Sequence, residues 1–367
     1  MTILKHMMMG AAGAGGAGGY SLWSWGGGAS GKLGDGTTVN KSSPVQIGDL
    51  TDWASLGAGT SHKAATKTDG TLWAWGLGSS GQLGDGTTVN KSSPIQIGSL
   101  TDWASVAGSG NHLSAIKTDG TLWSWGNGGH GKLGDGTTVN KSSPIQVGAL
   151  TNWSTVSSSN NFCSAIKTDG TVWTWGRGAY GALGNGSTAS KSSPVQVGAL
   201  TTWASSANGG HHVLALKTDG TLWIWGYNGR GQLGDGTTAN KSSPIQVGAL
   251  TTWASVSGGS YNSAAIKTDG TLWTWGNNSS GQLGDGTTAN KNSPVQVGAL
   301  TTWASVESGN SHTSAIKTDG TLWAWGSGSI GTLGDGTTAN KSSPVQIGSL
   351  TDWENVSSKS GSSALKS

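Results

Sequence analysis

The fold of this chain is decided by the stretch Lys117-Thr-Asp-Gly-Thr-Leu-Trp-Ser-Trp-Gly126, which is followed by Gly131-Lys-Leu-Gly-Asp-Gly-Thr-Thr138. Near-copies of this stretch occur seven times at a constant step of 50 residues. The Trp-x-Trp pair marks each copy: Trp23/Trp25, Trp73/Trp75, Trp123/Trp125, Trp173/Trp175, Trp223/Trp225, Trp273/Trp275 and Trp323/Trp325. A fixed period of this length indicates one supersecondary unit copied in space, as a closed ring or an open stack.

The placement of tryptophan shows that the repeat folds. A chain with 65 Gly, many Ser and Thr and few charges would be disordered if its apolar residues were scattered. All 21 Trp instead occupy three positions per repeat. The third position holds Trp53, Trp103, Trp153, Trp203, Trp253, Trp303 and Trp353. Each unit therefore has the same large side chains to bury.

Turn residues divide the unit into four short strands. Residues 114–118 and 120–125 are β-prone runs separated by Asp119-Gly120, which predicts a two-residue hairpin. Pro144 suits the first residue of an edge strand at 143–147, and residues 150–156 supply the last strand of the unit. Four strands with no helical period predict a propeller blade.

The two ends of the chain indicate how the ring closes. The first unit lacks the strand that should precede residue 20, and residues 362–366 align with that missing strand. We therefore expect residues 362–366 to pair with residues 21–25, which leaves no open edge. The predicted fold is all-β, a seven-bladed propeller over residues 20–367 whose four-stranded antiparallel blades are closed by N- and C-terminal strands.

Residues 1–19 match no part of the repeat and are rich in Gly and Ala. This composition predicts a flexible tether that leaves residues 1–9 free to bind a partner, with a disordered end as the alternative. The segment is too weakly apolar for a secretion signal, and no run approaches the roughly 20 residues of a membrane span, so we expect no membrane insertion.

The repeat resembles the regulator-of-chromosome-condensation repeat. The resemblance rests on Asp-Gly-Thr-Leu-Trp-x-Trp-Gly, Gly-x-Leu-Gly-Asp-Gly, Ser-Pro-x-x-Val/Ile and Gly-x-x-His, and it covers about residues 20–367. It implies a seven-bladed propeller closed by shared termini. The family includes a nucleotide exchange factor, a plant ultraviolet photoreceptor and a β-lactamase inhibitor. This chain has no insertion for a wedge between blades and no Gly-Trp-Arg-His-Thr, so the resemblance implies only a rigid disc that binds a macromolecule.

Composition argues against several other functions. The formal net charge of +3 is spread evenly, which argues against nucleic-acid binding. The repeated Asp-Gly turns are expected to hydrogen-bond nearby backbone, and neither a calcium loop nor a nucleophile elbow is present. Cys163, the only cysteine, is expected to be a packing residue. We expect no catalytic residue, no cofactor and no metal.

Two short windows per repeat vary while the frame is constant. One window follows Trp-Gly, as at 127–130, 177–180 and 227–230, and the other precedes the Ala-Ile-Lys strand, as at 160–163, 210–213 and 260–263. Tyr and Arg among small polar residues are typical of a binding surface. The predicted partner-binding residues are His62, His112, His130, Phe162, Arg177, Tyr180, His211, His212, Tyr227, Arg230, Tyr261 and His312.

Loops tolerate change, so drift is the alternative explanation of the windows. We expect His62, His112, His212 and His312 to act partly in packing, because the family often uses its Gly-x-x-His position structurally. The leading hypothesis is a non-catalytic propeller that recognises a protein or glycan, as an adhesin or an external component of a bacteriophage virion. In the virion case, residues 1–19 contact other virion proteins. The alternative is a purely structural assembly protein.

Overall fold

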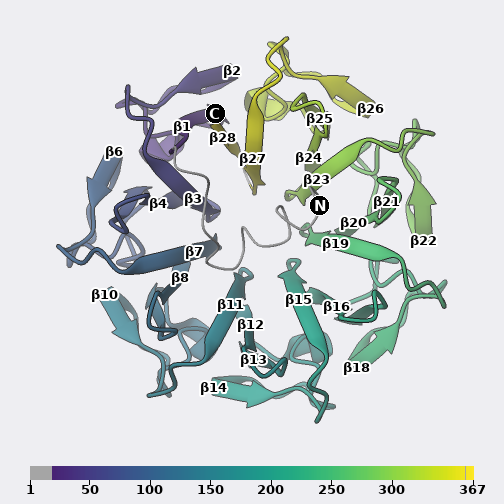
Figure 1. Ribbon diagram of the computed structural model, residues 1–367, viewed down its shortest axis with the longest axis horizontal. Coiled ribbons are helices and arrows are strands. Elements are labelled where there is room, and N and C mark those ends of the chain that lie inside the picture. Colours follow the sequence, from purple (N-terminus) through teal and green to yellow (C-terminus); the bar gives the residue numbers. More distant parts are fainter. Residues whose placement is uncertain (1–18, 360) are drawn as a thin grey trace.

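Seven antiparallel sheets surround an axis in the computed structural model, which describes residues 19–359 and 361–367 (Figure 1). The predicted tether, residues 1–19, lies outside the described residues except for Gly19. Each sheet has four strands, and the innermost strands line a central channel. The predicted fold class is therefore confirmed.

The blades are numbered from the first one built of consecutive strands. Blade 1 holds β3 (Trp53–Ala58), β4 (His62–Lys67), β5 (Leu72–Gly76) and β6 (Lys91–Gln96); blade 2 holds β7 (Trp103–Ser109), β8 (His112–Lys117), β9 (Leu122–Gly126) and β10 (Lys141–Gln146); blade 3 holds β11 (Trp153–Ser158), β12 (Phe162–Lys167), β13 (Val172–Gly176) and β14 (Lys191–Gln196). Blade 4 holds β15 (Trp203–Asn208), β16 (His212–Lys217), β17 (Leu222–Gly226) and β18 (Lys241–Gln246); blade 5 holds β19 (Trp253–Gly258), β20 (Asn262–Lys267), β21 (Leu272–Gly276) and β22 (Lys291–Gln296); blade 6 holds β23 (Trp303–Ser308), β24 (His312–Lys317), β25 (Leu322–Gly326) and β26 (Lys341–Gln346).

Blade 7 closes the ring with strands from both ends of the chain. It holds β27 (Trp353–Ser358), β28 (Gly361–Lys366), β1 (Ser21–Gly26) and β2 (Lys41–Gln46). Strands β1 and β28 pair in antiparallel register from Ser21 opposite Lys366 to Gly26 opposite Gly361. The predicted pairing of residues 362–366 with residues 21–25 is confirmed.

The blade and the sequence repeat are out of phase by one strand. The prediction made residues 150–156 the last strand of their unit, but β11 is the innermost strand of the following blade and pairs with β12. The outer strand β10 ends at the rim, so the chain must return to the axis before the next blade can begin. Residues 147–152 make that crossing, and the prediction was wrong about the blade to which the strand belongs.

The Asp-Gly hairpin forms, but the hydrogen bond from Lys117 N to Thr121 O at 3.0 Å encloses three residues instead of the two predicted. In blade 2, Gly120 N–H donates to Lys117 O at 2.9 Å, and Gly120 has a φ of +76°. A turn followed by a glycine in the left-handed region is the usual three-residue hairpin connection. The Asp119 carboxylate accepts from Thr121 N at 2.9 Å and Thr121 Oγ1 at 2.7 Å. The predicted backbone role of the repeated Asp is confirmed here.

The hydrophobic core lies between blades, and tryptophan is its largest component. Trp125 of blade 2 is fully buried in a cluster with Ala64, Leu72 and Leu83 of blade 1. A Cβ on Gly84 would lie 2.7 Å from Trp125 Nε1, so only glycine allows this loop to approach the indole. Each blade therefore buries its tryptophan against the preceding one.

The tryptophan at the third position packs against the two other tryptophans of its blade. Trp103 meets the rings of Trp123 and Trp125 edge-on, with centroid distances of 6.0 Å in both cases. Lys117 Nζ lies 4.5 Å from the Trp123 ring centroid, a distance at which the cation is attracted to the ring face. The expectation that the Trp side chains form the core is confirmed, although Trp123 stays half-buried under the Lys117 ammonium.

The seam between blades 7 and 1 contains a buried lysine. Lys63 Nζ of blade 1 lies within hydrogen-bonding distance of Ser24 Oγ at 2.8 Å, of Ser362 O at 3.2 Å and of Ser363 Oγ, all in blade 7. Burial, together with the positive charge of Lys32, lowers the pKa of Lys63 to about 7. The Lys63 amine therefore lies buried where the two ends of the chain meet, and folding favours its neutral form.

This seam predicts a specific pH dependence of stability. The unfolded chain binds one more proton than the folded chain between pH 7 and the ordinary lysine pKa, so the folded state gains about 1.4 kcal/mol per pH unit as pH rises through this range. The Lys63→Met variant lacks this gain. Urea unfolding of both proteins from pH 7 to 10 measures the difference in their free energies of unfolding. A difference that does not change with pH would contradict the neutral seam lysine.

Candidate functional site

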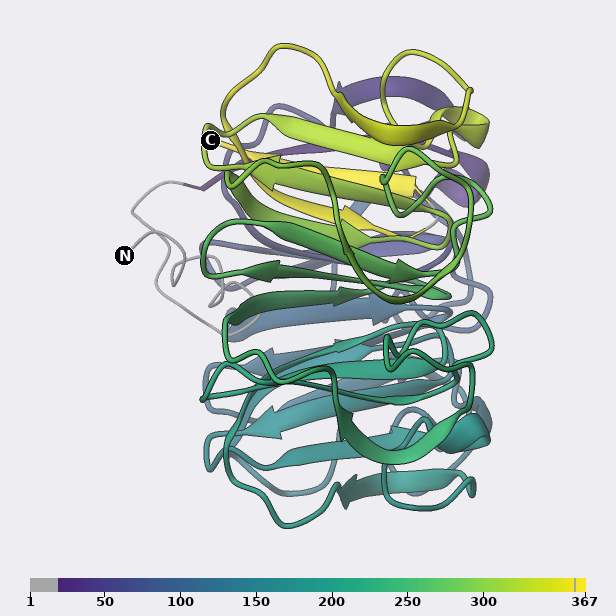
Figure 2. The ribbon, with the colours of Figure 1, turned by 90° about the vertical axis from the view of Figure 1, so that its right-hand side faces the viewer.

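Strand direction brings both variable windows of a blade to one face of the ring. In blade 4, β15 ends at the turn that contains His211, and β17 ends just before Tyr227. Tyr227 N–H donates to His211 O at 2.9 Å, so the two windows are hydrogen-bonded neighbours. We call the face with these turns the loop face. The Asp-Gly hairpins and the C-terminal Ser367 lie on the opposite, terminal face (Figure 2).

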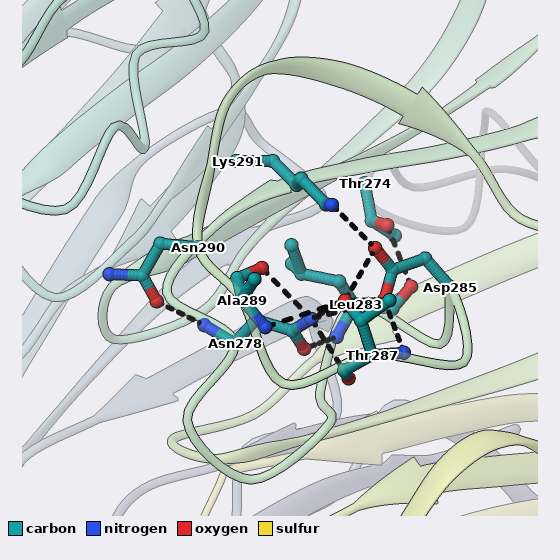
Figure 3. Close-up of polar contacts among 8 residues, drawn as sticks. All are labelled: Thr274, Asn278, Leu283, Asp285, Thr287, Ala289, Asn290 and Lys291. Atoms are coloured by element: carbon teal, nitrogen blue, oxygen red, sulfur yellow. Dashed lines mark hydrogen bonds and ion pairs between the residues drawn. The ribbon is translucent and has the colours of Figure 1, made fainter.

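A polar network, present in blades 4 and 5, fixes the backbone of the window that follows Trp-Gly. In blade 5, buried Asn278 donates through Nδ2 to Asp285 Oδ1 at 3.1 Å and to Ala289 O at 3.2 Å (Figure 3). Its Oδ1 accepts from Leu283 N at 2.9 Å, and Lys291 pairs with Asp285 at 3.3 Å. The loop is thus cross-linked by polar contacts within itself, and in blade 5 one window residue, Asn278, makes several of them.

One residue beneath the window selects the conformation at its tip. Where the chain has Gln, the side-chain oxygen accepts the backbone N–H two residues earlier, as in Arg230 N to Gln232 Oε1 at 2.9 Å. Blade 3 has Ala182 at this position, and Tyr180 takes a φ of +63°. The left-handed tips belong to the short 3₁₀ turns η1 (Ala29–Gly31), η2 (Gly129–Gly131), η3 (Ala179–Gly181) and η4 (Ser329–Gly331). A tyrosine in this region is strained.

Four rings from three successive blades meet on the loop face, and we call Tyr180, His211, Tyr227 and Tyr261 the aromatic patch. Tyr180 and Tyr227 have centroids 4.9 Å apart, and Tyr227 and Tyr261 have centroids 6.0 Å apart. His211 lies 5.9 Å from Tyr180 and 6.2 Å from Tyr261. Tyr180 is 44% exposed and Tyr261 is 39% exposed. The structure thus joins four of the predicted residues into one continuous, accessible surface.

Cationic side chains flank the aromatic patch. Arg177 is half-buried in the same window as Tyr180, and Arg230 is exposed in the same window as Tyr227. Burial lowers the pKa of His211, and the charge of Arg177 lowers it further. Burial also lowers the pKa of His130, with contributions from Arg177 and Lys132. Both histidines are therefore mainly neutral at pH 7, and the permanent charge beside the patch comes from arginine.

Five predicted residues lie inside the ring and cannot touch a docked partner with their side chains. They are His62, His112, Phe162, His212 and His312, each at most 2% exposed. The prediction that these five bind a partner is wrong, because the residue at this repeat position points into the interface with the next blade. The accompanying expectation that the four histidines serve in packing is confirmed.

These buried side chains meet one particular residue of the next blade. His212 Nε2 lies 2.9 Å from Ser263 Oγ, and His112 Nε2 lies 3.1 Å from Cys163 Sγ. Phe162 packs in one apolar cluster with Val213. In these three seams, the two histidines face polar residues and the phenylalanine packs with an apolar one. Cys163 is fully buried in a hydrophobic cluster, as the predicted packing role requires, and burial raises the pKa of its thiol to about 11.

A feature that the sequence did not reveal lies in the central channel. The innermost strands enclose a cavity of about 310 Å³, lined mostly by small residues, with Glu307 and Lys359 among the exceptions. Burial raises the pKa of Glu307, while the positive charge of Lys359 and a hydrogen bond from Ser257 lower it. Glu307 is the only acid at its repeat position, and this difference between the repeats is the sequence signal that could have revealed a charged group in the channel.

Two negative observations concern the described part of the chain. Within residues 19–359 and 361–367, no three His, Cys, Asp or Glu residues gather as metal ligands. The same residues contain no helix of the length and apolar character that a bilayer crossing requires.

A closed ring of seven blades with a constant frame and variable loops on one face defines a repeat propeller. Residues 106–366 match the RCC1-like domain, and residues 21–66 and 69–116 match the regulator of chromosome condensation (RCC1) repeat. The chain therefore belongs to the RCC1-repeat family. A comparison with curated proteins finds no matching sequence.

Solved structures show the same fold. Human WBSCR16 is 20% identical with a TM-score of 0.86, and the alignment covers 95% of this chain and 98% of that one. Yeast RCC1 (Prp20) bound to Kap60 is 19% identical with a TM-score of 0.86, covering 100% and 92%. Prp20p from Saccharomyces cerevisiae, described with its binding to Gsp1p and histones, is 20% identical with a TM-score of 0.85, covering 98% and 93%.

The buried histidines predict acid sensitivity. Burial lowers the pKa to about 4 for His62 and His312 and to about 3 for His212. The unfolded chain therefore binds more protons than the folded chain between pH 6.5 and 4, and stability falls as pH falls, by about 1.4 kcal/mol per unit for each such histidine. His312→Asn, which copies Asn262 of blade 5, should reduce the slope by one proton in urea unfolding. An unchanged slope would contradict burial as the cause.

The left-handed backbone at Tyr180 predicts that two substitutions there differ in stability. Tyr180→Ala and Tyr180→Gly both remove the ring, but only glycine relieves the left-handed conformation. We expect the Gly variant to be more stable than the Ala variant by about 1 kcal/mol. The same two substitutions at Tyr227, whose φ is not positive, should give no advantage to glycine. Thermal and urea unfolding of the four variants checks this, and equal effects at both sites would disprove the strain.

Proposed function

We propose that this propeller is a non-catalytic recognition protein that binds a partner protein through its loop face. The aromatic patch is the observation that carries this proposal. Tyr and Arg supply much of the binding energy in protein interfaces, where they cluster among small adaptable residues. Here Tyr180, Tyr227 and Tyr261 form such a cluster, with Arg177 and Arg230 beside it.

The surroundings of the patch suit recognition better than catalysis. The thiol of Cys163 and the ring of His112 contact each other at 3.1 Å, but both are fully buried. Catalysis needs groups of shifted pKa that reach a substrate. The accessible groups on the loop face are instead rings and cations on a rigid frame, which suits a binding surface.

Structural neighbours support a protein partner over other classes. Yeast RCC1 (Prp20) is seen bound to Kap60, and Prp20p is described with its binding to Gsp1p and histones. These partners belong to those proteins, and by analogy the partner class extends to this chain. A glycan partner, or a place on a virion or in an adhesin, rests on the sequence composition alone.

A structural assembly role is the second candidate, and exposed leucines favour it. Each repeat has one such leucine on the terminal side of the rim, between 41% and 48% exposed: Leu50, Leu100, Leu150, Leu200, Leu250, Leu300 and Leu350. Seven equivalent apolar side chains around a ring could pack against a larger particle. Residues 1–19 would then serve as the attachment segment.

Combined substitution of the patch separates the two candidates. The variant Arg177→Ala, Tyr180→Ala, Tyr227→Ala, Arg230→Ala should lose at least about tenfold in affinity for the protein that the full chain retains from its native source, because interface anchors are each worth about 1 kcal/mol or more. Quantitative pull-down and circular dichroism measure binding and folding.

The control makes the same change at the same repeat positions on other blades: Leu77→Ala, Ser80→Ala, Ser327→Ala, Ile330→Ala. It should bind like the unchanged chain. Full binding by the patch variant, together with lost assembly when residues 1–19 are deleted, would instead establish the structural role.

A further inference from the structure

One ion pair of the loop face is present in six blades and, among the described residues, absent from blade 3. In six blades an Asp of the Gly-Asp-Gly turn pairs with the first lysine of the outer strand, from Asp35 with Lys41 at 3.4 Å to Asp335 with Lys341 at 3.5 Å. Blade 3 has Asn185 in place of the Asp. Lys191 consequently has no carboxylate partner among the described residues.

The unbalanced lysine lies in the blade that supplies Arg177 and Tyr180. Gly176 and Lys191 are directly paired in the register of β13 and β14, which places the Lys191 backbone beside the start of the Arg177 window. Arg230 adds a third positive charge one blade further on, beyond Tyr227. The missing carboxylate and Tyr180 of the aromatic patch are separate changes in the repeat, and they occur in the same blade.

Negative charge is scarce near the patch. The six Asp of the Gly-Asp-Gly turns are each paired with lysine, and Glu307 is the other carboxylate that strand direction places toward the loop face, at the wall of the channel. The Asp-Gly hairpins put the remaining repeated Asp, such as Asp169 and Asp219, on the terminal face. Within the described residues, the surface around the patch is therefore aromatic and positively charged.

We propose that the aromatic patch, with Arg177, Lys191 and Arg230, binds an acidic segment of the partner protein. This deepens the proposed function and rests on it. Arginine recognises carboxylates through paired hydrogen bonds, and the tyrosine rings offer rigid apolar area with a hydroxyl at the edge. The occupant is a stretch rich in Asp and Glu that also has an aromatic or aliphatic side chain to pack on the rings. Three separate cations form no continuous stripe for nucleic-acid phosphates, which favours a peptide.

An unbiased peptide selection tests the chemistry of the occupant. A random displayed peptide library is selected on the full chain and depleted on the fourfold alanine variant of the patch. We expect the enriched peptides to contain several Asp or Glu and at least one large apolar residue. Enrichment of neutral or basic peptides would overturn the acidic segment but leave loop-face recognition intact. No enrichment that depends on the patch would overturn both.

The Asp–Lys ion pair that blade 3 lacks provides a matched variant that tests the role of positive charge in peptide binding. Asn185→Asp restores in blade 3 the pair that six other blades contain, so the fold tolerates it. It should weaken binding of the best acidic peptide about twofold to fivefold, as expected for loss of one exposed charge interaction. Asp335→Asn makes the reverse change away from the patch and should leave the affinity unchanged. Fluorescence anisotropy of the labelled peptide measures both, and equal affinities for Asn185→Asp and the unchanged chain would contradict the proposal.

Competition separates the peptide from other polyanions. The acidic peptide should bind more weakly at 0.5 M than at 0.05 M NaCl by about tenfold, because exposed charges are screened. Replacing its Asp and Glu by Asn and Gln should abolish binding. A heparin fragment or a single-stranded oligonucleotide of equal charge should displace it poorly. Tighter binding of either polymer than of the peptide at 0.15 M NaCl would overturn the proposal in favour of that class of ligand.

Discussion

The structure depends on the burial of one indole between each pair of neighbouring blades. Trp225 illustrates the arrangement, because its ring is fully buried and its Nε1 donates to Ala182 O of the preceding blade at 3.1 Å. A Trp side chain removes a large apolar area from water, and an edge-on partner such as Trp203 adds to that. Seven such interfaces replace a single central core. This explains how a chain with 65 Gly can fold, since small residues occupy the places where backbone and indole meet.

Because stability resides between the blades, the loop face can change its sequence. The contacts of Asn278 and Gln232 occur in some blades and not in others, so the blade folds without them. Tyr180 goes further and occupies a backbone conformation that disfavours its side chain. Such strain persists when surrounding structure over-determines it, and it often accompanies a functional surface. The concentration of rings and arginines in blades 3 to 5 is thus compatible with a frame that is otherwise almost uniform.

The sequence predicted the architecture because its signals were local and repeated seven times. The spacing of Trp predicted the blade, and the unmatched ends of the chain predicted that the strands of Ser21 and Lys366 pair to close the ring. It misplaced the inner strand because a chain that crosses from rim to axis has no distinctive residue pattern. It also assigned Phe162 and four histidines to the surface, since variability at a repeat position was taken to mean exposure. Those positions are buried because they face the next blade, as His212 faces Ser263, and that contact joins residues 51 apart.

The site could be predicted only as a set of windows, because contacts between blades depend on the closed ring. Tyr180, Tyr227 and Tyr261 lie in different repeats. Only the closed ring brings their side chains together, with centroid distances of 4.9 Å between the first two and 6.0 Å between the last two. Hydrogen–deuterium exchange of the full chain, free and bound to the protein it retains from its native source, tests the central claim most directly. Protection confined to residues 177–180, 209–213, 227–230 and 259–262 is the predicted result. Protection of the Asp-Gly hairpins on the terminal face, with the windows unchanged, would contradict it.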